Sequence, residues 1–452
     1  MPVQLLTIAR NAFVESLRQP IMFVLIMASG IMQILNTWGT NFSMGQESAT
    51  EVTGDDKLLL DIGLATIFGC ATLLAGFIAT AVLSREIENK TVLTVVSKPV
   101  SRATLVLGKY LGVTGAISAA VVIMLVFLLF GIRHGVMATA AHELDMPVLV
   151  YSFGAVVLAM VLGGWCNYFY GWSFPQTFVG ILLPTILLAY GLLLGTGKQW
   201  QFQPLAKDFH PQVMLACVCL GMAVLVLTAV AIAASTRLSQ VMTITVCFGV
   251  FVIALMSNYL VGRHVFKATS IGAIAEIKAD DPSKADLTEL GCILSLRLEQ
   301  PSKLVVKPGD ALYFSPSPNG FPGLSKGSYA DFTGPLDDAN AAFGPDAASA
   351  LILIDGGGSQ LKIRHQGQAP LPLTRTLEVG DYVFLDPVRV NIPAMAVWGV
   401  VPNLQYFWLL DPISQGRRVP VAYVGLVALY SLCQIGTFLS IAIALFQRRD
   451  LG

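Results

Sequence analysis

Long apolar runs separated by short polar segments dominate the chain. A membrane-spanning helix needs roughly 20 mostly apolar residues, and eight segments qualify. They are residues 20–37, 58–83, 107–131, 147–170, 175–195, 211–235, 240–262 and 420–446. The pattern predicts an α-helical polytopic membrane protein. The fourth and fifth segments are joined by a short aromatic linker, so a hairpin within the interface is the alternative, which would leave six spans.

The distribution of basic residues predicts the orientation, because short cytoplasmic loops carry an excess of Lys and Arg. With the N-terminus inside, the inner segments carry Arg10, Arg18, Arg85, Lys90, Lys98, Arg102, Lys109, Arg237, Arg448 and Arg449. The short outer loops then carry Lys57, Arg133, Lys198 and Lys207. Arg417 and Arg418 at the outer end of the last span count against this orientation. An even number of spans places both termini in the cytoplasm.

Two cytoplasmic elements are expected before the third span. Residues 1–19 place Leu6, Ala9, Phe13 and Leu17 on one helical stripe, which is typical of an amphipathic helix in the membrane interface. The alternative is a simple lead-in to the first span. The second element, residues 84–106, is named here the coupling loop.

The coupling loop is the most charge-dense stretch of the membrane part. Glu86 and Lys90 form an i,i+4 pair that favours a short helix, and Pro99 ends it. Ser101 is placed to cap the next helix, which carries Arg102 and Lys109 toward the third span. A short helix held by two spans would act as a rigid lever on the cytoplasmic face. The plainer interpretation is an ordinary basic loop that obeys the positive-inside rule.

Residues 263–395 change character, because Pro, Gly and Asp become frequent and apolar residues alternate. This pattern predicts an inserted, small, mostly-β extracytoplasmic domain. The expected strands are residues 294–298, 304–306, 311–314, 351–354, 361–365 and 382–385, and residues 315–347 are expected to form a long loop.

Two stretches of the insert share a V-x-(P)-G-D-x-φ-F core, at residues 305–314 and 377–384. A duplicated hairpin in a small barrel would explain the similarity, and chance repetition of a common turn would explain it equally well. Residues 396–452 then form an interfacial segment and the last span. The apolar segment 393–406 is too broken to span, so it is expected to anchor the insert at the outer interface or to gate an exit.

Composition narrows the function classes. Hydrophobic residues make up 55% of the 452 positions and the formal net charge is zero, so nothing indicates a nucleic-acid partner. The deep apolar runs are interrupted by uncharged Asn258 and Gln434, whereas an ion-coupled carrier usually keeps ionisable groups in mid-membrane. A secondary carrier is therefore disfavoured, and energy is expected to enter from elsewhere.

No motor or metal site is apparent in the sequence. Gly195-Thr-Gly-Lys198 lacks the first Gly and the Ser or Thr of a phosphate-binding P-loop. The cysteines lack partners at metal-ligand spacing, and no cofactor is expected on this chain. Small residues at spacing four, Ala71 to Ala79 and Gly108 to Ala120, allow close helix packing within one subunit or at a subunit interface.

Three motifs follow one another along the chain. They are Thr7 to Arg18 at the start, Glu88, Thr91, Ser97 to Arg102 and Leu107 to Gly112 around the loop before the third span, and Leu445 to Leu451 at the end. In this order they resemble the motifs of type-two ATP-binding-cassette (ABC) permeases. The resemblance covers residues 1–262 and 395–452. It implies a coupling helix seated on a separate ABC ATP-binding subunit, and a second permease half, expected to be a homodimer partner. It also implies a location in the bacterial cytoplasmic (inner) membrane.

The resemblance carries over a set of contact residues and a function. The residues expected at the ATPase-subunit interface are Glu86, Glu88, Thr91, Lys98, Pro99, Arg102 and Lys109. The expected function is that of a permease subunit, not itself an enzyme, of an ATP-driven exporter, with ATP and Mg on the partner. The alternative is a non-transporting complex that transmits force to the outer domain. Such permeases commonly have six spans, whereas eight and an insert are expected here.

Overall fold

The computed structural model consists of two compact units, the bundle unit, Met1–Leu255 with Pro402–Gly452, and the barrel unit, Met256–Val401. The described residues are 2–39, 54–84, 101–135, 144–267, 270–280, 287, 291–302, 304–316, 332, 334–336, 338, 341, 349–367, 377–385, 389–410, 413 and 419–448. The insert was expected at 263–395, and the contacts divide the chain at 256 and 401.

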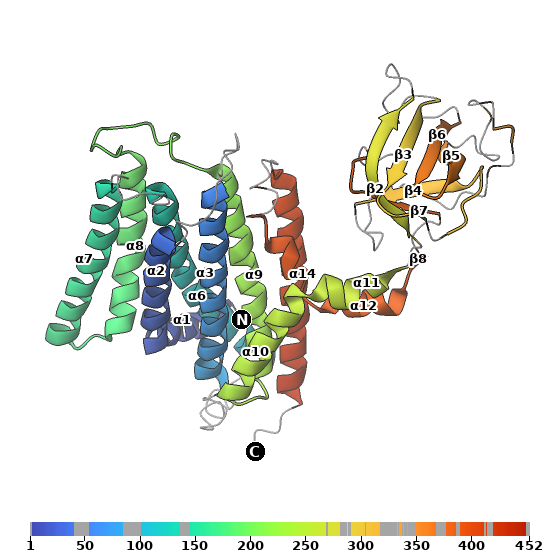
Figure 1. Ribbon diagram of the computed structural model, residues 1–452. Helices are drawn as coiled ribbons and strands as arrows, with labels where there is room; N and C mark the ends of the chain where they lie inside the picture. The colour runs from blue at the N-terminus through green and yellow to red at the C-terminus, as the bar shows by residue number, and fades with distance from the viewer. Residues whose placement is uncertain are drawn as a thin grey trace. The chain divides into compact units, whose positions relative to one another are not determined.

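The bundle unit is mainly helical, and Figure 1 shows most of its helices running roughly parallel. Its helices are α1 (Pro2–Leu17), α2 (Pro20–Gly39), α3 (Gly54–Ala79), η1 (Thr80–Ser84), α6 (Arg102–His134), α7 (Met146–Tyr170), α8 (Phe174–Leu194), α9 (Pro211–Ser235), α10 (Gln240–Leu255), η4 (Leu404–Phe407) and α14 (Val421–Gln447). Helices α3, α6 and α9 carry much of the buried core. The outward faces of α7 and α14 expose large apolar side chains, as expected where lipid is the solvent.

Seven helices of the described chain are long and apolar enough to cross a membrane. An eighth is reached if α10 and the helical segment Asn258–Val265 are counted as one broken span. The protein is therefore a polytopic helical membrane protein. The expected span 240–262 is bent rather than straight, because α10 ends at Leu255 and the helical segment that begins at Asn258 turns away by 58°.

The small-residue stripes pack within the chain. Ala71, Ala75 and Ala79 of α3 are buried, as are Ala116 and Ala120 of α6. The interpretation of packing within one subunit is therefore confirmed for these positions.

The barrel unit begins with η2 (Asn258–Gly262) and α11 (Arg263–Val265) and ends with α12 (Ile392–Val400). Between them lie β1 (Phe266–Lys267), β2 (Ser270–Ala279), β3 (Ile293–Leu298), β4 (Ala311–Ser315), β5 (Ala350–Gly357), β6 (Gln360–Gln366), β7 (Tyr382–Phe384) and β8 (Arg389–Val390). Strands β2 to β7 form a closed antiparallel barrel in the order β2-β3-β6-β5-β4-β7, while β1 pairs with β8. Closure leaves no open sheet edge among these six strands.

Two expectations for the insert are corrected. Residues 304–306 form no strand. They follow a turn in which the Leu304 backbone N–H donates to the Ser302 hydroxyl. The ten-residue strand β2 was missed. The expected loop 315–347 lies almost wholly outside the described residues.

The two G-D turns are structurally equivalent. Gly309 and Gly380 have φ of 94° and 95°, a left-handed conformation that favours glycine. The Asp310 carboxylate accepts from the Lys307 N–H at 2.7 Å, and the Asp381 carboxylate accepts from the Glu378 N–H at 3.0 Å. Each turn also exchanges two backbone hydrogen bonds with one residue of a neighbouring strand, Leu353 for the first turn and Ile274 for the second.

The equivalence extends to the whole barrel. In the register, Ala311 lies opposite Ile352 as Tyr382 lies opposite Ala273. The irregularity between Ile274 and Glu276 in β2 corresponds to the one between Leu353 and Asp355 in β5. The halves β2-β3-β4 and β5-β6-β7 are thus related by an internal twofold, which explains the repeated motif as a structural duplication.

Equivalent turns predict equivalent energetics. Replacing Asp310 or Asp381 by Ala removes a charge-assisted hydrogen bond, so each change should cost roughly 1.5–3 kcal/mol of barrel stability. Hydrogen exchange at the barrel amides of the full-length protein measures this cost. The matched Asp→Asn variants keep an acceptor oxygen and should lose less; a loss confined to one of the two turns would contradict the equivalence.

Candidate functional site: two polar ends of the helical bundle

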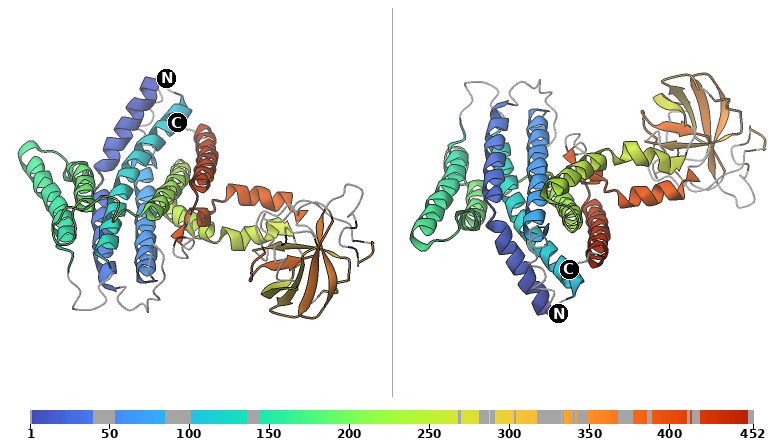
Figure 2. Two further views of the ribbon diagram at one scale, coloured as in Figure 1. Left: turned by 90° about the horizontal axis from the view of Figure 1, so that it is seen from above. Right: turned by 90° about the horizontal axis from the view of Figure 1, so that it is seen from below.

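Helix α1 packs directly on the N-terminal half of α6, and Figure 2 shows the two running side by side. A Cβ on Gly112 would lie 2.6 Å from the Cβ of Ala12 and still nearer to the carbonyl oxygen of Ala9. A Cβ on Gly108 would lie 2.7 Å from Ile8. The two backbones therefore touch without an intervening layer of side chains, the close approach that small residues permit in membrane helices.

Much of the expected stripe lies on the packed side of α1: Leu17 is buried, Phe13 packs against the core and the Ala9 carbonyl lies against Gly112. Ile8 also contacts α6, whereas Leu6 is 66% exposed. The position of this helix in the membrane interface stays a prediction.

An ion pair reinforces the contact between α1 and α6. The Lys109 ammonium lies 3.6 Å from the Glu15 carboxylate, and the Lys109 side chain is 6% exposed. A buried ammonium needs a nearby anion or strong hydrogen bonds. Lys109 was expected at the interface with the ATPase subunit; in the chain it is buried against α1, and its role in that interface stays a prediction.

Arg102 and Arg237 lie at the same end of the bundle. The Arg102 guanidinium donates to the carbonyls of Phe446 and Gln447 at 3.2 and 2.9 Å, and lies over the Phe446 ring. Arg237 donates to the Leu445 carbonyl at 3.1 Å. These carbonyls end α14, and cations are favourable at the negative end of a helix dipole. The beginning of α6 and the end of α9 are thereby tied to the last span.

Most of the coupling loop lies outside the described residues, including Glu86, Glu88, Thr91, Lys98 and Pro99. Both of its attachments to the bundle are described. On the first side η1 contains fully buried Val82 and Leu83. On the second side the expected cap is confirmed, because the Ser101 hydroxyl accepts from the Thr104 N–H at 3.1 Å.

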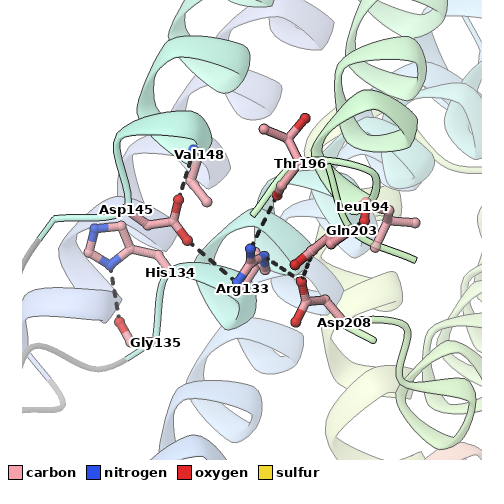
Figure 3. A network of polar contacts seen from close by, with 9 residues as sticks. All are labelled: Arg133, His134, Gly135, Asp145, Val148, Leu194, Thr196, Gln203 and Asp208. Carbon is pink, nitrogen blue, oxygen red and sulfur yellow. Dashed lines mark hydrogen bonds and ion pairs between the residues drawn. The ribbon is translucent and has the colours of Figure 1, made fainter. Parts of the chain in front are cut away.

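A second polar cluster lies at the far end of α6, shown in Figure 3. The guanidinium of Arg133 lies 3.6 Å from the Asp145 carboxylate and 3.1 Å from the Asp208 carboxylate. It also donates to the Thr196 carbonyl at 3.4 Å. Asp145 is the N-cap of α7, and Thr196 and Asp208 lie between α8 and α9. One arginine therefore holds together the ends of four helices.

Burial makes this cluster energetically sensitive. The side chain of Arg133 is 11% exposed and that of Asp145 is fully buried. Gln203 supports Asp208 through its amide, which also donates to the Leu194 carbonyl at 3.2 Å. A buried ion pair adds little net stability, but removing one partner leaves an uncompensated buried charge. The cluster is thus suited to fix one arrangement of the four helix ends.

Between the two ends, the buried polar groups of the described spans are mostly amides and hydroxyls. Gln33 and Asn36 of α2 donate to the Gly63 and Leu59 carbonyls of α3 at 3.1 and 2.8 Å. These two hydrogen bonds join α2 to α3, as polar side chains do between membrane helices. Gln434 donates to the Tyr430 hydroxyl at 3.2 Å within α14.

Comparison with known proteins identifies part of the bundle. Residues 6–168, from α1 to the end of α7, match the family described as ABC-2 family transporter protein. This region is therefore similar to ABC-2 type permeases. The match covers a little over a third of the chain and includes the α1–α6 contact, the coupling loop and Arg133. No curated protein and no solved structure matches the chain.

The bundle unit also holds an apolar cavity of about 620 Å³. It is lined by Ala65, Phe68, Phe251, Leu255, Leu404, Gln405 and Trp408. The Gln405 amide, which lines the cavity, donates to the Leu255 carbonyl at 3.1 Å and is thus hydrogen-bonded to the cavity wall. In the segment around η4, Leu404 and Phe407 are buried in the bundle core, so this segment belongs to the bundle unit. Its expected position at the outer interface stays a prediction.

Sequence reasoning missed the Arg133 cluster. Arg133 was counted only as an outer-loop cation, and Asp145 and Asp208 were not singled out. The one local signal is Asp145 before Met-Pro-Val, a residue that favours an N-cap position. The pairing itself joins positions 12 and 75 residues from Arg133, which periodicity does not reveal.

The backbone contact at Gly112 predicts a sharp response to a single methyl group. Gly112→Ala should cost about 1–3 kcal/mol, because α1 must move away from α6 to relieve the overlap. Thermal unfolding in detergent and hydrogen exchange of α1 measure both effects. The matched control is Gly154→Ala on α7, where nothing lies within 4 Å of the added carbon. Equal behaviour of the two variants would refute the close contact.

The Arg133 cluster predicts a loss and a rescue. Arg133→Ala should cost about 3–5 kcal/mol, since it leaves the Asp145 carboxylate buried without its cation. Pairing Arg133→Gln with Asp145→Asn should recover part of the loss, because Asn keeps the cap and carries no charge. Thermal unfolding of the purified permease is the measurement. Exposed Lys207→Ala on the same loop should change stability by less than about 0.5 kcal/mol.

Proposed function

We propose that the chain is the membrane-spanning permease subunit of an ATP-driven ABC exporter, coupled to ATP hydrolysis on a separate subunit. The observation that carries the proposal is the ABC-2 family match over residues 6–168. That region contains both attachments of the coupling loop to the bundle. In this proposal ATP and Mg are bound by the partner, and this chain contributes motion.

The proposed path of force begins at the coupling loop. Its first attachment, η1, continues α3, and its second is the capped start of α6. A push on the loop would therefore reach two spans at once. Because α1 touches the α6 backbone at Gly112, α1 would follow the same movement.

Helix α6 would carry the movement across the membrane. Its 33 residues correspond to about 50 Å at 1.5 Å per residue, enough to cross the whole bilayer. It begins at Arg102 and reaches Arg133 in its last turn. A displacement at the first end would thus act on the Arg133 cluster, which holds α7 and the α8–α9 connection. Opening of that cluster is the proposed release step for outward movement of substrate.

The proposed topology places the Arg102 end in the cytoplasm and the Arg133 end outside. Both termini are then cytoplasmic, the barrel unit is extracytoplasmic, and the membrane is the bacterial cytoplasmic membrane. The support is the Lys and Arg excess of the segments assigned to the inside. A second permease half, most simply a copy of this chain, completes the transporter.

The coupling loop gives the test of the proposed function. Replacing Glu88 and Lys98 together by Ala should reduce the ATP-binding subunit that copurifies with the tagged chain by about tenfold, since losing about 1.4 kcal/mol of contact energy weakens binding tenfold. Membrane insertion should be unchanged. The readouts are P-loop peptides identified by mass spectrometry and ATP hydrolysis by the purified complex.

A control with the same change in charge separates a contact from a general effect. Glu276→Ala with Lys278→Ala removes one acid and one base from the barrel, where the two form a 2.9 Å ion pair. This variant should retain the ATP-binding subunit. If both double variants copurify it equally well, the coupling loop is not the contact.

A further inference from the structure

The barrel unit has a helical stem at its root. The stem consists of residues 258–265, which form η2 and α11, and of residues 392–400, which form α12. Figure 2 shows the two helical segments of the stem lying side by side within this unit. The Asn391 N–H donates to the Val265 carbonyl at 2.7 Å, and β1 pairs with β8 directly beyond. The stem is therefore one paired element.

Helix α12 is apolar at all nine positions and has no buried residue. Ile392 is 76% exposed and Val397 is 56% exposed, and Met395 and Val400 are also exposed. At about 100° per residue these four side chains spread over more than half of the helix circumference. A helix that docks on a protein surface presents one apolar face, whereas a helix surrounded by lipid is apolar all round.

Charge is confined to the barrel end of the stem. Arg263 and His264 are exposed there, and the Arg263 guanidinium lies 4.7 Å from the centre of the Tyr259 ring. Segments 256–267 and 389–401 contain no Asp or Glu. Basic groups that flank an apolar stretch are typical of the level of lipid headgroups, where long cationic side chains reach the phosphates.

We infer that the stem is inserted into the acyl chains of the bilayer, with Arg263 and His264 at the headgroups and the barrel in water. The stem does not span: nine residues of α12 correspond to about 14 Å, half of the hydrocarbon thickness. It follows directly in the chain from α10, whose Leu255 is exposed, as is Met256. The stem would hold the barrel against the membrane surface. This inference goes beyond the proposed function and does not depend on transport.

Spin labels on single cysteines test the inference in the full-length protein reconstituted in vesicles. The spin label is attached to the variant Val397→Cys, in a protein whose seven native cysteines are replaced. Leu188→Cys on the exposed face of α8 is the lipid control, and Val305→Cys, 83% exposed on the barrel, is the water control. Relaxation by oxygen, which concentrates in lipid, is compared with relaxation by a water-soluble nickel chelate. The ratio at position 397 should match position 188 and exceed position 305 several-fold.

The other outcomes overturn the inference. A label at position 397 as accessible to nickel as the one at 305 places the stem in water. A label protected from both reagents means that protein covers α12, either a second copy or the bundle unit.

A second measurement needs no cysteine replaced. Lipids brominated along their chains quench tryptophan that lies among them, and Trp398 belongs to α12. The fluorescence difference between the native protein and the Trp398→Phe variant isolates this side chain. We expect that difference to be strongly quenched. A Trp398 signal that brominated lipid leaves unchanged contradicts insertion.

Discussion

The contact between the backbones of α1 and α6 is the constraint on which the rest of the bundle depends. At Gly112 nothing larger than a hydrogen fits between the two helices, so α1 has one position on α6. Lys109 and Glu15 add a charged contact beside it. In a bilayer, where apolar surface gains little by leaving lipid for protein, such close packing and polar contacts supply much of the specificity. Helix α1 is thereby held in a fixed position against α6, which is the longest span.

Charge is concentrated at the two ends of that span. Arg102 ties the start of α6 to the end of α14, and Arg133 ties its end to α7 and to the α8–α9 connection. Between them the described spans use amide and hydroxyl hydrogen bonds such as those of Gln33 and Asn36. The charged contacts at the two ends of α6 and the uncharged hydrogen bonds between α2 and α3 together define how these spans pack.

Local signals in the sequence were enough to predict the seven long apolar helices, the Ser101 cap and the repeated G-D turns. Non-local features were not. Strand β2 was missed because its register shift between Ser270 and Gly272 changes the period: the buried side chains Ile271 and Ile274 are three residues apart, which does not alternate. The Arg133 cluster joins three segments distant in sequence. The end of α10 at Leu255 falls inside an apolar run whose hydropathy continues.

The barrel and the bundle are stabilised in different ways. The barrel repeats a three-stranded half, and its closure satisfies its own backbone without neighbours. The bundle has no such closure and takes its order from lipid and from a few close contacts. The central claim, that work enters this bundle through the cytoplasmic coupling loop, is tested most directly by labelling Lys98→Cys with a membrane-impermeant maleimide. The account predicts labelling in inside-out vesicles and none in intact cells; labelling in intact cells would contradict it.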